Sequence, residues 1–179
     1  MKKATLVVLP VAVVLMFASL AFAQDEQSPG CGDPNTKFAV KTTKSQHSGH
    51  LNGAQPDSGK ALVYFVEDDT GFESRPKPTT RIGVDGQRVG ATHGNSYLFF
   101  SVDPGVHHLC ASWQTAIALF LGRQTAAAHF TAEAGRTYFF SAKNIWILNG
   151  PTDMSLNPMD SDEGELLANK FSFSTSHPK

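Results

Sequence analysis

The histidines are the residues of this sequence best suited to hold a metal ion or to move a proton. His107 and His108 are adjacent in a segment expected to be a strand, so their side chains should point to opposite faces. They cannot bind one ion together, but either could do so with His129 if the strands carrying them pair. The competing interpretation is one inward histidine with a satisfied hydrogen bond and one facing solvent. We therefore expect no metal site. If one existed, His107, His108 and His129 would be its candidate ligands.

Other residues offer less defined chemistry. His47-x-x-His50 stands in a stretch rich in Ser and Gly and lacks further ligands at zinc spacing. The acidic run 67–69 ends an apolar segment and does not have EF-hand spacing, so a solvated turn is the expected structure. The sequence has no G-x-S-x-G, no H-E-x-x-H and no phosphate-loop or dinucleotide fingerprint. We therefore identify no catalytic residue and no cofactor-binding residue, and we expect no cofactor.

Cys31 and Cys110 are the two cysteines of the chain. An even pair in an exported protein most simply forms one disulfide, and two free thiols are the alternative. The bond would close a loop of about 80 residues, for which the chain-entropy model gives about 4–5 kcal/mol. Cys110 stands in an apolar run with no neighbour that would depress its pKa, so a nucleophilic role is not expected.

The N-terminus has the features of a signal peptide. Lys2 and Lys3 precede the apolar stretch 6–20, and Ala21-Phe22-Ala23 supplies small residues at a cleavage site. The polar residues that begin at Gln24 favour cleavage between Ala23 and Gln24. Cleavage would leave residues 24–179 and, by removing two lysines, change the formal net charge from −1 to −3.

Two other interpretations of the N-terminus compete with cleavage. The stretch 4–23 is just long enough to span a bilayer, so an uncleaved anchor is one. Lipidation of Cys31 is the other, but Ser28-Pro29-Gly30 precede this cysteine instead of the small and aliphatic residues of a lipoprotein signal. We expect export to the periplasm or the extracellular space, no lipid anchor and no stable membrane span after cleavage.

Composition excludes two broad classes. The formal net charge of −1 and the sequence pI near 6.6 argue against a nucleic-acid partner, which a basic face would recognise. The apolar fraction of 41% is too high for a disordered chain of such balanced charge.

The pattern along the chain is that of short strands separated by turns. Residues 24–59 should be an extended leader with a short strand and a flexible loop, before a β-sandwich domain over residues 60–179. Strands are expected at 60–67, 79–84, 87–92, 97–102, 106–113, 125–132 and 136–142, with further short ones at 36–43 and 145–148. Residues 60–67 are apolar at both parities, which indicates a central strand covered on both faces. Residues 150–158 should be a loop, and residues 114–124 fit either a helical turn or a hairpin.

Turn and cap residues connect these elements. Asp85-Gly86 predicts a hairpin, and Pro104 and Gly105 predict a tight turn, as Gly135 does later in the chain. A single short helix is expected at residues 160–170, with an acidic first turn, a capping side chain at its start and leucines 166 and 167 against the sheet. The predicted fold is mainly β: an antiparallel β-sandwich of about seven to nine strands, Ig-like or transthyretin-like, with one short C-terminal helix.

Three segments carry a resemblance to known proteins. They are RIGVDG…VG at 81–90, VDPGVHHL at 102–109 and FTAEAGRTYFF at 130–140. Their order resembles a family of exported bacterial proteins known as domain of unknown function 2846. More loosely, it is similar to PEGA-type and carboxypeptidase-regulatory-like β-sandwich modules. The resemblance spans about residues 60–143 and implies a secreted or envelope-associated β-sandwich with no assigned catalytic residues. The chain lacks the lipobox of many relatives.

Three functions follow as hypotheses. The first is an exported cell-envelope module with a structural or binding role, whose partner is another envelope protein or a small ligand. The second is a carrier of a small apolar ligand in a β-lined cavity. The third is a hydrolase with an unrecognised site of histidine and acid. An enzyme should bring ionisable groups together in a cleft, and a carrier should leave its adjacent phenylalanines around a cavity.

Overall fold

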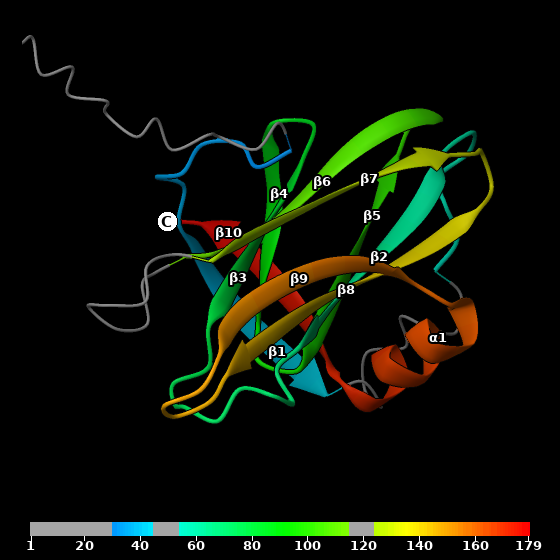
Figure 1. Cartoon of the computed structure of the whole chain (residues 1–179). Coiled ribbons are helices and arrows are strands. Elements are labelled where there is room, and N and C mark those ends of the chain that lie inside the picture. Colours follow the sequence, from blue (N-terminus) through cyan, green and yellow to red (C-terminus); the bar gives the residue numbers. More distant parts are fainter. Residues whose placement is uncertain (1–29, 45–53, 115–123) are drawn as a thin grey trace, which may run out of the picture.

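The computed structural model describes residues 30–44, 54–114 and 124–179 (Figure 1). The described part is mainly β, with ten strands in two sheets and one helix. In chain order the elements are β1 (Phe38–Lys44), β2 (Ala61–Asp68), β3 (Thr79–Val84), β4 (Gln87–His93), β5 (Ser96–Val102), β6 (Gly105–Trp113), β7 (Thr125–Ala132), β8 (Thr137–Trp146), β9 (Thr152–Met159), α1 (Ser161–Lys170) and β10 (Ser172–Pro178).

The strands form a six-stranded sheet of order β1-β10-β5-β2-β8-β9 and a four-stranded sheet of order β4-β3-β6-β7. The expectation of purely antiparallel pairing is wrong at two places, because β10 pairs with β5 and β2 pairs with β8 in parallel. The strand count of seven to nine is also too low for the ten strands described. Residue patterning locates a strand but carries no information on the direction of its neighbour.

Both missed strands lie in segments with little apolar alternation. β9 occupies most of the predicted loop at 150–158 and pairs antiparallel with β8 at one edge of the six-stranded sheet. It buries Met154 and Leu156, while Asp153 and Pro158 made the segment look like a loop. β10 follows the helix and lies between β1 and β5. Pairing with strands distant in sequence therefore decides the structure of both segments.

Two apolar cores meet at the six-stranded sheet. One contains residues of both sheets, and the other lies between the six-stranded sheet and α1. β2 contributes alternate residues to the two cores, as its apolar character at both parities predicted. The adjacent phenylalanines divide likewise: Phe100 and Phe140 pack in the core shared by the sheets, and Phe99 and Phe139 pack on the helix side. Each pair thus fills two cores and does not leave one ring outside.

The helix begins and ends as its sequence predicts. The carboxylate of Asp160 accepts a hydrogen bond from the Asp162 N–H at 2.8 Å, which caps the first turn. Gly164 lies directly on Phe139, where a Cβ atom would stand 2.4 Å from ring carbons. A glycine inside the helix therefore allows close approach to the sheet. Leu167 packs against the sheet, but Leu166 is 66% exposed and does not dock as expected.

Candidate functional site

The structure pairs β6 with β7 and so brings two of the predicted histidines together. His108 lies opposite His129 in the antiparallel register, and their ring centroids are 6.4 Å apart. Both residues are exposed. His107 points to the other side of β6, where it contacts Phe130. The strand pairing that metal binding by His129 requires is therefore present, and His108 is its partner.

His107 is held between two acceptors at the start of β6. Its Nδ1 lies 2.6 Å from Oδ2 of Asp85, and its Nε2 lies 2.6 Å from the carbonyl oxygen of Asp103. A carbonyl oxygen and a carboxylate can only accept, so this geometry favours the protonated imidazole, in which both ring nitrogens donate. Burial lowers the pKa of His107, but the hydrogen bonds and negative charges of Asp85 and Asp103 outweigh it and raise this pKa above its ordinary value. We call His107, Asp85 and Asp103 the His107 clamp.

The hairpin predicted at Asp85-Gly86 is present, and Asp85 of the His107 clamp is its first turn residue. Asp85 has φ 49° and Gly86 has φ 80°, the left-handed conformations that this turn requires. The second carboxylate oxygen of Asp85 accepts the N–H of His108 at 2.8 Å. Burial raises the pKa of Asp85, but these bonds to His108 and His107 outweigh it and leave the pKa below its ordinary value. The turn between β3 and β4 is thereby fastened to β6.

The clamp is poorly suited to catalysis. Both nitrogens of His107 are occupied by protein acceptors, so no ring lone pair is available to take a proton from a substrate. Asp103 is in turn paired with Lys60 at 3.3 Å, on the exposed turn that includes Pro104 and Gly105. Gly105 and Gly135 have φ 139° and 77°, as their turns need. These turn residues have a local structural role.

A second group of ionisable residues is buried between the sheets. The solvated turn expected at 67–69 is therefore wrong for Glu67 and Asp69, because the strands around them exclude water from both side chains. Glu67, Asp69, Thr80 and Asn144 have no exposed surface. The amide Nδ2 of Asn144 lies 3.0 Å from Oε1 of Glu67 and 2.7 Å from Oδ1 of Asp69. The Thr80 hydroxyl donates to the same Glu67 oxygen at 2.6 Å. Trp113 donates to Oδ1 of Asn144 at 2.9 Å and so fixes the orientation of the amide. We call Glu67, Asp69, Thr80 and Asn144 the buried carboxyl cluster.

The cluster cannot carry two negative charges at low cost. Burial raises the pKa of Glu67 well above its ordinary value, and the charge of Asp69 adds to this. Burial likewise raises the pKa of Asp69 to about 6, although Asn144 and the Lys77 ammonium act in the opposite direction. Oε2 of Glu67 and Oδ2 of Asp69 have no hydrogen-bond partner. A carboxyl group that stays protonated relieves this arrangement, because a neutral acid is far less costly to bury than a carboxylate.

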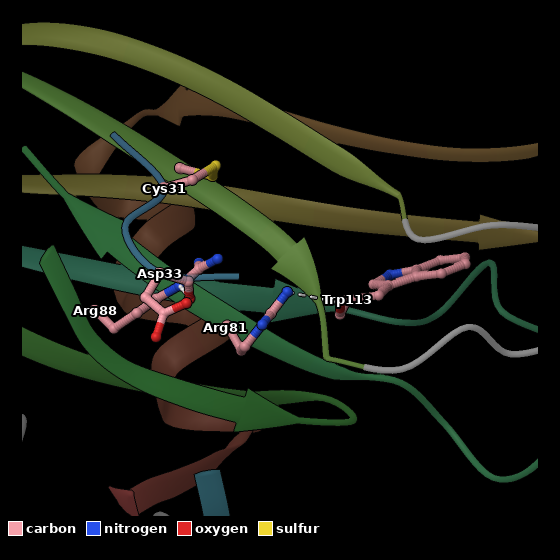
Figure 2. Close-up of a disulfide and its surroundings, with 6 residues drawn as sticks. Cys31, Asp33, Arg81, Arg88 and Trp113 are labelled. Carbon is pink, nitrogen blue, oxygen red and sulfur yellow. Dashed lines mark hydrogen bonds between the residues drawn. A yellow bond between two sulfur atoms is a disulfide. The ribbon is translucent and has the colours of Figure 1, made fainter. Parts of the chain in front are cut away.

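The disulfide predicted between Cys31 and Cys110 is present, with a Cα–Cα distance of 4.8 Å. It anchors residues 30–37, which we call the N-terminal strap, to the four-stranded sheet (Figure 2). Gly83 of β3 lies directly below the strap, where a Cβ atom would stand 2.3 Å from the carbonyl oxygen of Gly30. The glycine at this position lets the strap reach the sheet backbone.

Two arginines hold the strap further along. Arg81 is almost fully buried and donates to the carbonyls of Pro34 and Thr36 at 2.5 and 3.2 Å. It also donates to the carbonyl of Trp113 at 3.2 Å (Figure 2). Arg88 donates from Nε to the Asp33 carbonyl at 3.3 Å. Burial and the neighbouring Arg81 charge lower the pKa of Arg88 to about 10. The one sign of Arg81 in the sequence is a charged residue inside the predicted strand at 79–84.

Several predicted features lie outside the described residues. They are the signal peptide at 1–23 with its cleavage site at Ala23 and Gln24, the pair His47 and His50, and most of the ambiguous segment 114–124. Within the described ranges, no helix is long and apolar enough to cross a membrane. The same ranges contain no group of three or more His, Cys, Asp or Glu residues placed to hold a metal ion.

Comparison with known proteins identifies the family. A family model described as "Protein of unknown function (DUF2846)" matches residues 57–159. The chain belongs to the DUF2846 family. The DUF2846 match runs from just before β2 to the end of β9, so it includes the His107 clamp, the buried carboxyl cluster and the pair His108 and His129. The N-terminal strap, α1 and β10 lie outside it.

Other comparisons add little to the DUF2846 assignment. No curated protein matches the chain. One solved structure, described as "NMR structure of the protein from Eubacterium rectale", is 16% identical with a TM-score of 0.35. The alignment covers 62% of this chain and 98% of that one.

Proposed function

We propose that this DUF2846 protein is exported, loses its signal peptide after Ala23, and acts in the cell envelope as a non-catalytic binding or structural module. The Cys31–Cys110 disulfide is the observation that carries the proposal. Such bonds persist in oxidising compartments and are rare where thiols are kept reduced. The bond fastens the first described residues after the proposed signal peptide, so oxidation after export would complete the fold at its N-terminus.

The non-catalytic part rests on how the ionisable groups are used. The His107 clamp has both ring nitrogens bound by protein acceptors. The buried carboxyl cluster has no exposed surface through which a substrate could be reached. The paired phenylalanines fill the two cores, which disfavours a carrier with its cavity between them. A binding or structural role is left as the function that these arrangements support best.

We also propose that the two sheets form a β-sandwich of the Ig-like or transthyretin-like kind over residues 60–179. Support comes from one apolar core that both sheets share and from the two-sheet strand order. The leader at 24–59 contains the strap and β1, so it would connect the signal peptide to the sandwich and also add one edge strand to the six-stranded sheet.

Cell fractionation with thiol trapping tests the proposed location. The full chain, expressed in a bacterium with an active Sec system, should appear in the periplasm or medium. Its thiols should be labelled by a maleimide only after denaturation and reduction. Recovery in the membrane fraction, or two thiols that react in denaturant without reductant, would contradict the proposal.

A substrate panel tests the non-catalytic part. Purified protein is assayed with chromogenic ester, glycoside, phosphate and peptide substrates beside a His107→Gln variant and a Glu67→Gln variant. We expect no turnover above background for any of the three proteins. Turnover that either substitution abolishes, while the circular dichroism spectrum stays native, would identify a hydrolase and overturn this assignment.

A further inference from the structure

The exposed pair His108 and His129 has a geometry that none of the roles above uses. The two residues are direct partners in the β6–β7 ladder, and both side chains project from the same face. Their ring centroids are 6.4 Å apart and the rings are inclined by 44°. Two imidazoles on one face of a rigid ladder are already ordered relative to each other, so little backbone freedom is lost when a common ligand binds.

The separation of the rings fits a shared metal ion. Metal–nitrogen bonds of about 2.0–2.1 Å allow two ring centroids to lie from about 5 Å apart, at a tetrahedral angle, to about 6.5 Å apart in a linear arrangement. The observed 6.4 Å lies at the upper end of this range. Both side chains are exposed, so small changes in their side-chain torsions can bring the nitrogens to tetrahedral or square-planar geometry.

The surroundings hold the backbone of one ligand in place. The Asp85 carboxylate binds the backbone N–H of His108, and the backbone N–H of Asp85 donates to the His108 carbonyl at 3.0 Å. On the same face, the β7 neighbours of His129 are Ala127 and Thr131, which are exposed and carry small side chains. The β6 neighbours of His108 are the exposed Val106 and the disulfide-bonded Cys110. His107 is occupied in its clamp and points to the other face, so it does not compete for the ion.

We propose that His108 and His129 form a two-imidazole site for a borderline transition-metal cation of the Cu²⁺, Ni²⁺ or Zn²⁺ type. Imidazole nitrogen suits these ions, whereas Mg²⁺ and Ca²⁺ require oxygen ligands that the pair does not supply. Two protein ligands leave coordination positions open to water or to a donor group of another molecule. A metal held in this way would give the exposed face of β6 and β7 an attachment point for an anionic or imidazole-bearing partner.

Titration calorimetry with Cu²⁺ and Zn²⁺ on the mature, disulfide-bonded protein tests the proposal. We expect one ion per chain, with tighter binding of Cu²⁺. The variants His108→Gln and His129→Gln should each weaken binding by at least about tenfold, which is the low end of the loss caused by changes even outside the ligand set. The double variant should lose less than the two single losses combined, because either substitution already destroys the chelate and leaves only one monodentate ring to remove. Unfolding curves without metal check that each variant folds.

Matched controls separate this pair from other histidines. His177→Gln removes an exposed histidine of β10 and should leave the affinity unchanged. A variant with both His47→Gln and His50→Gln should also bind normally. In the NMR spectrum, Zn²⁺ should shift the imidazole signals of His108 and His129 before those of any other histidine. Affinity that survives the loss of either ring of the pair, or that is lost with His47 and His50, would overturn the proposal.

Discussion

Replacing Asp69 by Asn should change how the stability of the protein depends on pH. Burial raises the pKa of Asp69 from 3.8 to about 6, a difference of about 2 pH units, which corresponds to about 3 kcal/mol. Between these two values the folded protein holds a proton that the unfolded chain has released. The free energy of unfolding therefore falls as pH rises from about 4 to about 6 and stays low above that. Glu67 acts in the same direction, because burial raises its pKa as well.

Asn in place of Asp69 keeps a carbonyl oxygen to accept the Asn144 amide and removes the charge that burial penalises. The variant should be close to wild type in stability near pH 4 and more stable by up to about 3 kcal/mol at pH 7. Subtracting the wild-type curve from the variant curve cancels the contributions of groups common to both, including His107. Only the change that belongs to Asp69 and its coupling to Glu67 is left.

Urea unfolding followed by tryptophan fluorescence, at half-unit steps from pH 3.5 to 8, measures this difference. Trp113 is fully buried and bonded to Asn144 of the cluster, so its emission reports directly on the region. Asp153→Asn, at an exposed position of β9, is the matched control and should show no such trend. A difference between variant and wild type that stays constant or shrinks from pH 4 to pH 7 would refute the reasoning.

Three further predictions concern stability. His107→Gln should lower the free energy of unfolding by about 1–2 kcal/mol at pH 5.5. The loss should become smaller as pH rises through the raised pKa of His107, because the clamp stabilises the fold only while the ring is protonated. Urea unfolding at several pH values measures this difference. Gly164→Ala should lower the melting temperature and the free energy of unfolding, the latter by about 1–3 kcal/mol, because the added methyl group clashes with Phe139. Leu166→Ala, at an exposed position, should not lower the melting temperature. The reverse order, with Gly164→Ala the more stable variant because Ala has the higher helix propensity, would contradict this prediction. Arg81→Leu should cost at least about 2 kcal/mol and speed reduction of the disulfide by dithiothreitol, since the strap loses its bonds to that side chain; an unchanged reduction rate would contradict the role assigned to it.

Local chemistry accounts for the features that the sequence predicted well. The capping carboxylate of Asp160 needs only the next helical turn, and the Asp85-Gly86 hairpin needs only the left-handed backbone of two residues. The continuous apolar run of β2 indicated cover on both faces, which two apolar cores provide. The presence of two cysteines was enough to suggest the Cys31–Cys110 bond.

The remaining features depend on contacts between distant segments. The parallel pairing of β2 with β8 and the insertion of β10 beside β5 follow from the route of the chain, which no local pattern encodes. Glu67 and Asn144 are 77 positions apart, and each looks like an ordinary polar residue at the end of a strand. Their burial became apparent only when the strands were placed next to each other. The pairing of His108 with His129 likewise required the register of β6 and β7.

The intact mass of the protein recovered after export tests the central claim most directly. Export with cleavage after Ala23 and oxidation of both cysteines predicts the mass of residues 24–179 less two hydrogens, and a gain of those two hydrogens on reduction. A chain that starts at Cys31 and carries a lipid-sized increment, or a full-length chain whose mass does not change on reduction, would contradict the account.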